Sequence, residues 1–290
     1  MIELKSFNST DENTWCPGCG NFAILPCIKE SLFELGLSPE EVVMVSGIGQ
    51  AAKTPHYLRA NVFNGLHGRA LPPAQAIKIV NKDLKVIVTS GDGDAYGEGG
   101  NHFLHNIRRN VDIVQLVHNN QIYGLTKGQG SPTTTRGQVT SLQFDGTYTD
   151  PLNPLAVAIG AGATFVARSF SGEKEHLKEM IKKAINHKGY ALIDILQPCV
   201  TFNKVNTFKW YKDRSYKLDE TYDPKDKIQA FKKSLEFGDE GIPLGIIYLD
   251  ETKKTYHESH PVLKSGVNLI NRKWQPKDAQ NLIDEFLFNN

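Results

Sequence analysis

The residues best suited to chemistry follow two consecutive apolar runs of the sequence. Gly-Asp-Gly-Asp at residues 91–94 comes directly after the apolar run 84–90, and two asparagines, Asn119 and Asn120, come after the next run, 111–118. Short apolar runs of this kind are typical of strands buried on both faces of a parallel sheet. The carboxyl ends of parallel strands meet at one edge, where ligands bind in open α/β sheets. We therefore expect these polar residues to lie together.

The side chains in these two segments suit a magnesium ion that holds a diphosphate. Mg²⁺ prefers oxygen ligands and keeps few protein contacts, because substrate phosphates complete its octahedron. Asp92 offers a carboxylate, Asn120 an amide oxygen, and the backbone carbonyl of Ile122 a third oxygen. Gly91 and Gly93 let the backbone approach a diphosphate closely. The alternative is that Gly-Asp-Gly-Asp is only a surface turn, but the paired asparagines favour the metal site.

Four cysteines are the other candidates for metal chemistry. Cys16 and Cys19 form a Cys-x-x-Cys pair in a loop rich in proline and glycine, and Cys199 follows a proline after the apolar run 190–196. In a reducing compartment such thiols are ligands or buried groups rather than disulfides. The Cys-x-x-Cys spacing suits one corner of an iron–sulfur cluster. A structural zinc site would need four ligands, and the sequence contains no second pair.

Apolar runs alternate with amphipathic stretches along most of the chain. Strands are expected at residues 42–46, 84–90, 111–118, 163–167 and 190–196, and helices at residues 21–35, 72–80, 100–109, 154–159 and 173–187. This alternation predicts an α/β fold with a doubly wound parallel sheet.

The alternation of apolar runs and amphipathic stretches becomes weak after residue 201. We predict an α/β domain over residues 1–201 and a C-terminal extension over residues 202–290 that packs on the domain or on a partner subunit. The apolar run at residues 243–249 is expected to form an edge strand or a hairpin.

Charge and hydropathy argue against a nucleic-acid-binding protein and against a membrane protein. The 33 basic and 32 acidic residues leave a net charge of +1, which argues against nucleic acid as a main partner. The first seven residues lack the apolar run of a signal peptide, and no stretch approaches the roughly 18 apolar residues of a membrane helix. We therefore expect a cytoplasmic protein without a nucleic-acid or membrane partner.

These motifs together resemble one enzyme family. An Asp in Gly-Asp-Gly followed by Asn-Asn about 25 residues later resembles the thiamine diphosphate motif, and the combination resembles the β subunit of archaeal-type 2-oxoacid:ferredoxin oxidoreductases. The likeness extends from about Asn13 to Tyr216. The stretches that carry it are residues 14–21 (Thr-Trp-Cys-Pro-Gly-Cys-Gly-Asn), 47–49 (Gly-Ile-Gly), 65–69 (Gly-Leu-His-Gly-Arg), 91–102, 119–129 and 197–199 (Gln-Pro-Cys).

The resemblance assigns roles to individual residues. It implies Mg²⁺ bound by Asp92, Asn120 and the Ile122 carbonyl, with the thiamine diphosphate close by. Lys53 would meet the carboxylate of a 2-oxoacid or a coenzyme A phosphate, or it is simply a solvated lysine. Leu125 would shape the substrate pocket, and Lys53 and His67 are the candidate catalytic residues. The residues expected at the cofactor are Gly47, Ile48, Gly49, His67, Gly91, Asp92, Gly93, Asp94, Asn120, Ile122 and Leu125.

The resemblance also implies an iron–sulfur cluster, and here the chain departs from the family. Cys16, Cys19 and Cys199 match three cluster ligands, but the fourth thiolate falls where this chain has Gln50. Neutral amides replace thiolates poorly at such irons. Four outcomes are open. One iron of a four-iron, four-sulfur cluster binds water, hydroxide or another group, or the cluster has only three irons. Alternatively, Cys27 supplies the fourth thiolate, or the chain has lost the cluster. Cys27 is more simply read as a buried small hydrophobe.

The activity implied is oxidative decarboxylation of a 2-oxoacid, pyruvate or 2-oxoglutarate, to an acyl-coenzyme A, with electrons passed to ferredoxin. A partner α subunit, or a fused equivalent, would complete the active site and supply the glutamate that polarises the cofactor's aminopyrimidine. Gln50 keeps open a second hypothesis, a thiamine diphosphate lyase or synthase subunit without electron transfer. A third hypothesis is a non-catalytic assembly subunit, against which the intact Asp92 and Asn120 argue.

Overall fold

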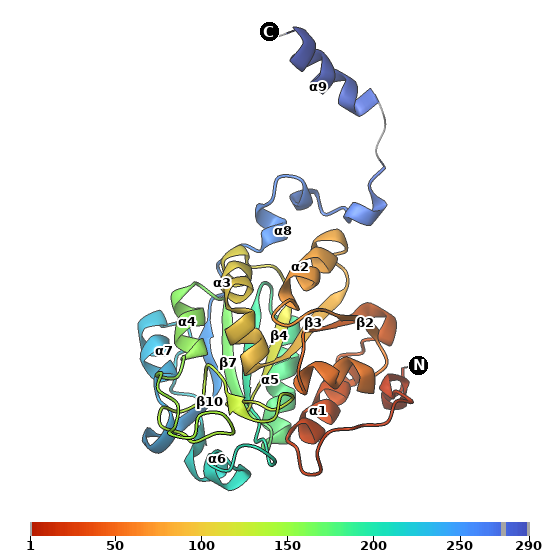
Figure 1. Ribbon diagram of the computed structural model, residues 1–290. Coiled ribbons are helices and arrows are strands. Elements are labelled where there is room, and N and C mark those ends of the chain that lie inside the picture. Colours follow the sequence, from red (N-terminus) through yellow and green to blue (C-terminus); the bar gives the residue numbers. More distant parts are fainter. Residues whose placement is uncertain (1, 274–276, 289–290) are drawn as a thin grey trace.

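An eight-stranded sheet forms the centre of the computed structural model (Figure 1), which describes residues 2–273 and 277–288. Its strands lie in the order β2-β1-β3-β4-β8-β7-β10-β9. Neighbouring strands of this described sheet pair in parallel, except that β10 is antiparallel to β7. The strands are β1 Val42–Ser46, β2 Asn61–Asn64, β3 Lys85–Gly91, β4 Val114–Asn119, β7 Phe165–Phe170, β8 Ala191–Leu196, β9 Ser215–Lys217 and β10 Ile242–Leu249, with a separate hairpin of β5 Ile122–Tyr123 and β6 Gln129–Gly130.

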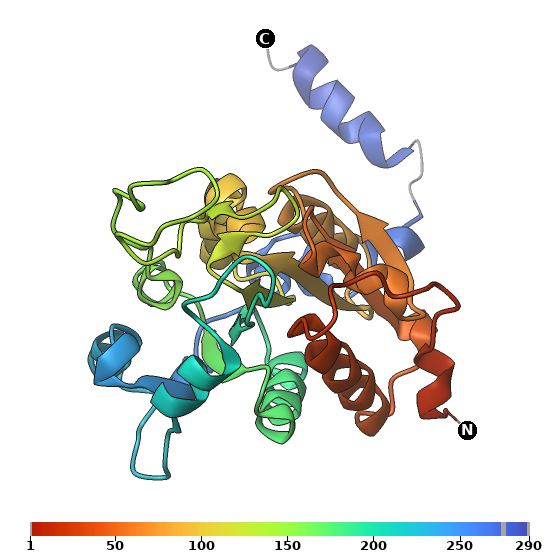
Figure 2. The same cartoon turned by 60° about the horizontal axis from the view of Figure 1, so that its bottom comes forward.

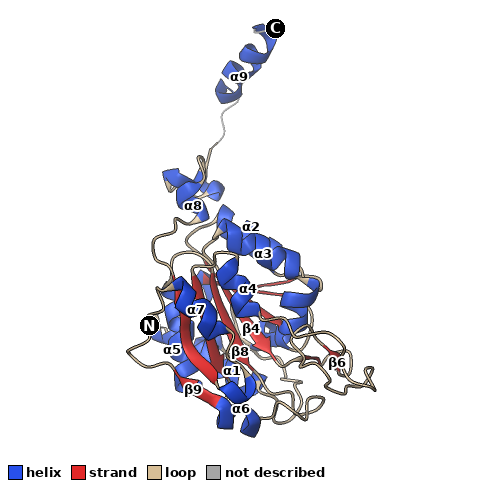
Figure 3. Cartoon of the chain, turned by 90° about the vertical axis from the view of Figure 1, so that its left-hand side faces the viewer, coloured by secondary structure: helices blue, strands red, loops and turns tan. Residues whose placement is uncertain are grey.

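Helices cover both faces of the sheet (Figure 3). Successive side chains of a strand point to opposite faces, so Val43 and Val45 of β1 join one core while Val42 and Met44 join the other. The first core is closed by α2, α3, α4 and α7, and the second by α1 and α5. The helices are α1 Asn21–Glu34, α2 Leu71–Val80, α3 Gly100–Arg109, α4 Pro154–Gly160, α5 Lys174–Asn186, α6 Phe208–Arg214, α7 Lys227–Ser234, α8 Tyr256–Ser259 and α9 Lys277–Phe288.

The predicted doubly wound sheet is confirmed, including all five strands and all five helices expected from the sequence. The interpretation of residues 243–249 as an edge strand or hairpin is wrong, because β10 lies between β7 and β9. Strands β9 and β10 both come from the C-terminal extension, so this part of the extension packs on the domain and enlarges its sheet. The division at residues 201 and 202 remains a prediction.

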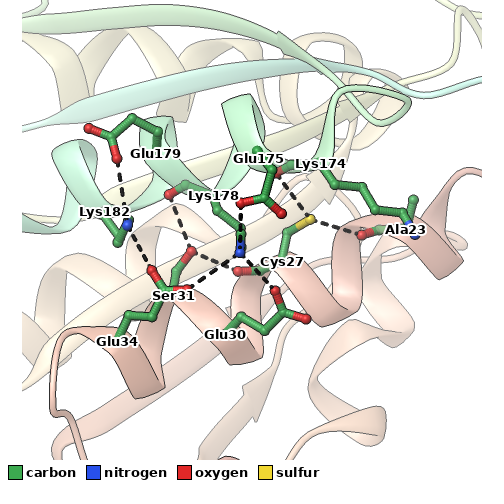
Figure 4. A network of polar contacts seen from close by, with 10 residues as sticks. All are labelled: Ala23, Cys27, Glu30, Ser31, Glu34, Lys174, Glu175, Lys178, Glu179 and Lys182. Atoms are coloured by element: carbon green, nitrogen blue, oxygen red, sulfur yellow. Dashed lines mark hydrogen bonds and ion pairs between the residues drawn. The ribbon is translucent and has the colours of Figure 1, made fainter.

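Helices α1 and α5 lie side by side (Figure 2), and a polar network joins them around Cys27 (Figure 4). The Cys27 thiol donates to the carbonyl of Ala23 at 3.1 Å and is 1% exposed. Lys178 of α5 forms ion pairs with Glu30 and Glu34 of α1 at 3.2 and 3.4 Å. Cys27 is therefore a packing residue of this helix interface.

The C-terminal helix α9 lies apart from the layered body, beyond α8 (Figure 1). Within residues 2–273 and 277–288, no helix combines the length and apolar character required to cross a bilayer.

Candidate active site at the carboxyl edge of the sheet

The two polar segments singled out in the sequence meet at one edge of the sheet. Strands β3 and β4 are neighbours in parallel register, with Gly91 paired to His118, so the residues that follow both strands lie together. The backbone N–H of Asn120 donates to Oδ1 of Asp92 at 3.4 Å. Strand pairing therefore brings the two predicted metal-ligand residues next to each other.

Asp92 is almost completely buried, with 1% of its surface exposed. Its Oδ2 accepts hydrogen bonds from the hydroxyls of Ser131 at 2.5 Å and Thr133 at 2.6 Å. Burial raises the pKa of Asp92 to about 6, because a carboxylate loses its hydration there, while these hydroxyls and the Asn120 N–H oppose the rise. A divalent cation beside Asp92 would stabilise the ionised form that burial disfavours.

The raised pKa predicts a pH dependence of stability in the absence of metal. From pH 3.8, the usual pKa of an aspartate, to about pH 6 the folded chain holds a proton on Asp92 that the unfolded chain has lost. The stabilisation that this proton gives the folded chain is complete below pH 3.8 and is lost by about pH 6. The free energy of unfolding therefore falls by about 3 kcal/mol as the pH rises over that range. Urea denaturation of the metal-free chain against pH should show a fall that Asp92→Asn reduces by about this amount. Parallel curves for both proteins would contradict the assignment.

Asn120 is held in one orientation by its neighbours. Its Oδ1 accepts from the Ile122 N–H at 3.0 Å, and its Nδ2 donates to Oε1 of Gln197 at 3.2 Å. Between Asn120 and Ile122, Gln121 adopts a left-handed backbone with φ of 57°, which is uncommon for a residue other than glycine. The Thr134 hydroxyl fixes this turn by donating to the Gln121 carbonyl at 2.6 Å. Such local strain is characteristic of functional sites, where the surrounding structure supports it.

Asp94 connects two loops beside the same edge of the sheet. Its Oδ1 accepts from the backbone N–H of Ile48 at 3.0 Å and of Gly68 at 2.8 Å, and Nδ1 of His67 lies 3.5 Å from it. A Cβ atom on Gly47 would lie 2.1 Å from Oδ2 of Asp94, so only glycine fits that position. Burial raises the pKa of Asp94, and the two N–H donors oppose this. The proposed place of Asp94 near a diphosphate remains a prediction.

A cavity of about 60 Å³ lies at this edge. His67 and Leu125 stand at its rim, with Leu125 41% exposed. Lys53 does not line the cavity, and its Nζ donates to the Thr14 hydroxyl at 3.3 Å. Gly47 is also outside the lining. The other predicted cofactor residues line it together, namely Ile48, Gly49, His67, Gly91, Asp92, Gly93, Asp94, Asn120, Ile122 and Leu125.

Several residues behind the predicted metal ligands were not anticipated from the sequence. Thr133, which donates to Asp92, also lies 2.9 Å from Oδ1 of Asn119. Nδ2 of Asn119 in turn donates to the carboxylate of Asp194 at 3.1 Å. Ser131 and Thr133 belong to a run of hydroxyl residues, Ser-Pro-Thr-Thr-Thr, which is the only local signal. Nothing in its spacing indicates that the run returns to the strand ends.

Asp194, which accepts the hydrogen bond from Asn119, also forms a buried ion pair. Its carboxylate accepts from the hydroxyl of Tyr96 at 3.0 Å and lies 3.9 Å from Nε of Arg168. Both members of the pair are buried, with 1% of Asp194 and 2% of Arg168 exposed. Burial raises the pKa of Asp194, and the positive charge of Arg168 opposes that rise. A chain of contacts thus runs from Arg168 through Asp194, Asn119 and Thr133 to Asp92.

A second, smaller cavity adjoins the first and is lined by Cys16, Cys19 and Cys199. Burial raises the pKa of Cys19 to about 11, and the nearby thiols of Cys199 and Cys16 add to the rise. Nε2 of Gln197 donates to Sγ of Cys19 at 3.5 Å. Cys27 lies elsewhere, in the α1–α5 interface. Among the residues that the structure describes, no group of three or more His, Cys, Asp or Glu side chains is already arranged around a metal position.

Two family descriptions match the sequence. Residues 43–195 match the thiamine pyrophosphate enzyme, C-terminal TPP binding domain, and residues 199–265 match the C terminal of the pyruvate ferredoxin oxidoreductase beta subunit. The first match spans strands β1 to β8, which include both strand ends of the candidate site.

Curated relatives and a solved structure agree with these matches. The chain is 48% identical over 267 residues to subunit beta of 2-oxoacid:ferredoxin oxidoreductase 1 from Aeropyrum pernix, covering 88% of this chain and 83% of the relative. It is 49% identical over 259 residues to the corresponding subunit from Saccharolobus solfataricus, covering 85% of each. The 2-oxoglutarate:ferredoxin oxidoreductase structure from Magnetococcus marinus superposes with a TM-score of 0.90 at 33% identity, covering 97% of this chain and 96% of that one. This chain therefore belongs to the β subunits of the 2-oxoacid:ferredoxin oxidoreductases.

Proposed function

We propose that this chain binds Mg²⁺ and thiamine diphosphate at the carboxyl edge of its sheet and, with an α subunit, oxidises a 2-oxoacid to an acyl-coenzyme A. Electrons pass to ferredoxin in this proposal, and the enzyme works in the cytoplasm. The observation that carries it is the contact between Asp92 and Asn120 at two neighbouring strand ends, in a chain of this family. The Mg²⁺ ligands are Asp92, Asn120 and the Ile122 carbonyl.

The donor set fits this cofactor. Asp92 offers a carboxylate that burial makes costly without a cation. The amide group of Asn120 is oriented by one hydrogen bond to its oxygen and one from its nitrogen. Thiamine diphosphate, when bound, supplies the electron sink needed to cleave the bond between a carboxylate and a keto carbon. The chain's own residues hold its diphosphate end through the metal. Asp94 joins the loops containing Ile48 and His67, which line the same cavity and would face this end.

The size of the cavity supports a partner subunit. Ligand pockets usually enclose about 300–1,000 Å³, and the cavity of about 60 Å³ here accommodates only part of a cofactor. Three apolar side chains are exposed on the edge strand β2 and in the loop after it, namely Val62, Phe63 and Leu66, and Leu66 is 75% exposed directly before His67. We assign this apolar surface, together with the open side of the cavity, to the α subunit, since such patches mark interaction sites.

The substrate assignment rests on a relative. The solved enzyme from Magnetococcus marinus holds 2-oxoglutarate, coenzyme A and succinyl-CoA. We propose 2-oxoglutarate or pyruvate as the 2-oxoacid of this chain, with Leu125 at the cavity rim limiting the length of the substrate side chain. Lys53 would need to leave its contact with Thr14 to meet a carboxylate.

The cysteine-lined cavity suits an iron–sulfur cluster that carries electrons away from the cofactor. Cys16, Cys19 and Cys199 supply three thiol ligands, and Asn120 lines this cavity as well as the cofactor cavity. The two groups would therefore be neighbours. Thiolate ligands are those that such clusters require, and a cation would offset the repulsion among three ionised thiols.

Anaerobic co-expression with the α subunit tests the proposal. The purified complex should contain thiamine diphosphate and Mg²⁺, and it should reduce ferredoxin only when a 2-oxoacid and coenzyme A are both present. Decarboxylation without ferredoxin reduction, in a complex without iron, would instead support the lyase or synthase hypothesis. A complex that binds no thiamine diphosphate would overturn the proposal and favour an assembly subunit.

A further inference from the structure

Gln50 differs from the other carboxamides around the cysteine-lined cavity. Oδ1 of Asn120 accepts from the Ile122 N–H, and Oε1 of Gln197 accepts from Nδ2 of Asn120. Oε1 of Gln50 is buried and, within the described structure, receives no hydrogen bond. A buried oxygen without a donor costs about 1–3 kcal/mol, and because Gln50 lines the cysteine cavity its oxygen is available to a ligand bound there.

The backbone of Gln50 is fixed at this position by the cysteine loop. Nε1 of Trp15 donates to the Gln50 carbonyl at 2.7 Å, and Trp15 directly precedes Cys16 in the sequence. Trp15 is 4% exposed and packs edge-on against Tyr57, with ring centroids 4.8 Å apart. The segment that carries the first thiol and the turn that carries Gln50 are therefore joined by a buried contact.

The position also places Gln50 between the two cavities. Gln50 lines the cysteine cavity and, with Ile48 and Gly49, the cofactor cavity. A cluster bound by the three cysteines would therefore present its remaining corner toward Gln50 and toward the cofactor.

We propose that Oε1 of Gln50 is the fourth ligand of a four-iron cluster whose other ligands are Cys16, Cys19 and Cys199. The proposal rests on the cluster described under the proposed function. An amide oxygen is neutral and harder than a thiolate, so the iron that it binds is held more weakly than the other three. The cluster also carries one negative charge fewer than a cluster with four thiolates, which makes its reduction easier.

Iron analysis of three variants tests this assignment in the anaerobically purified complex with the α subunit. Gln50→Leu removes the oxygen and keeps a similar shape, and Gln50→Cys replaces it with a thiolate. Gln138→Leu is the matched control, because Oε1 of Gln138 is also buried without a donor but lies outside the cysteine cavity. The readouts are iron and sulfide per chain, electron paramagnetic resonance, exchange of the cluster iron with added ⁵⁷Fe, and the reduction potential.

The expected results differ between the variants. The unaltered protein and Gln138→Leu should hold four irons, of which one exchanges with ⁵⁷Fe. Gln50→Leu should lose that iron and show the resonance of a three-iron cluster. Gln50→Cys should retain four irons without the exchangeable one, and its reduction potential should fall because a thiolate adds negative charge.

Two outcomes would overturn this inference and leave the proposed function intact. Either Gln50→Leu matches the unaltered protein in iron content and exchange, or Gln50→Cys leaves both the exchange and the potential unchanged. The second comparison also decides the matter if Gln50→Leu does not fold. An unaltered complex that binds thiamine diphosphate and Mg²⁺ but contains no iron would refute the cluster itself, and with it this ligand.

Discussion

Replacing Asp92 with alanine is expected to abolish binding of Mg²⁺ and thiamine diphosphate to the complex. The substitution removes the only charged ligand among the three proposed for the metal. Changes behind the ligands alone typically cost 10–100-fold in metal affinity, so loss of the ligand itself should exceed about a hundredfold. Calorimetric titration with Mg²⁺ and thiamine diphosphate measures this directly.

The stability of the Asp92→Ala variant distinguishes lost binding from lost folding. Removing the buried Asp92 carboxylate relieves its desolvation cost but leaves the Ser131 and Thr133 hydroxyls without this acceptor, and these opposing effects should leave the metal-free variant folded. Saturating cofactor stabilises a binding-competent complex by about 2.7 kcal/mol at a hundred times its dissociation constant. The variant should show none of this gain, whereas Asp213→Ala, a surface carboxylate in an exposed ion pair with Lys209, should show all of it. Unchanged cofactor occupancy in Asp92→Ala would refute the metal site.

Removing the Asp194 carboxylate should produce the largest loss of stability. Asp194→Ala leaves Arg168 as a buried charge without its counter-charge, which typically costs about 3–5 kcal/mol. It also removes the acceptor of Asn119 and Tyr96. Urea denaturation of the metal-free chain measures the loss. The double variant with Arg168→Met should lose less than the sum of the single variants, by about 1–3 kcal/mol of coupling. Additive losses would indicate that the two charges do not interact.

A milder pair of variants tests whether this network positions the metal ligands. Tyr96→Phe removes one hydrogen bond to Asp194 without changing any charge, and Tyr190→Phe removes the equivalent bond to Gln115 at a distance from the cofactor cavity. Both tyrosines are buried, so both variants should lose about 1 kcal/mol of stability. Only Tyr96→Phe should also weaken Mg²⁺ binding, because Asp194 connects through Asn119 and Thr133 to Asp92. Equal Mg²⁺ affinity in the two variants would assign the network a structural role only.

The sequence could not anticipate several functional contacts, for identifiable physical reasons. Ser131 and Thr133 reach Asp92 across about 40 residues, through a loop without regular periodicity. Asp194 lies within an apolar strand, where nothing local identifies its partners on β7 and β4. Strand β10 has the apolar pattern of any buried strand, and its place between β7 and β9 depends on pairing partners that the pattern does not encode.

The sequence by itself indicated five strands of the sheet, five helices around it and the two side chains proposed as metal ligands. Strand spacing and apolar runs are local properties, and two consecutive parallel strands that become neighbours necessarily bring Asp92 and Asn120 to one edge. Only the tertiary structure decided what surrounds these ligands. The buried charge of Asp194, the hydroxyls over Asp92 and the unpartnered oxygen of Gln50 depend on contacts between distant segments, because burial and hydrogen bonding arise from packing and not from residue order.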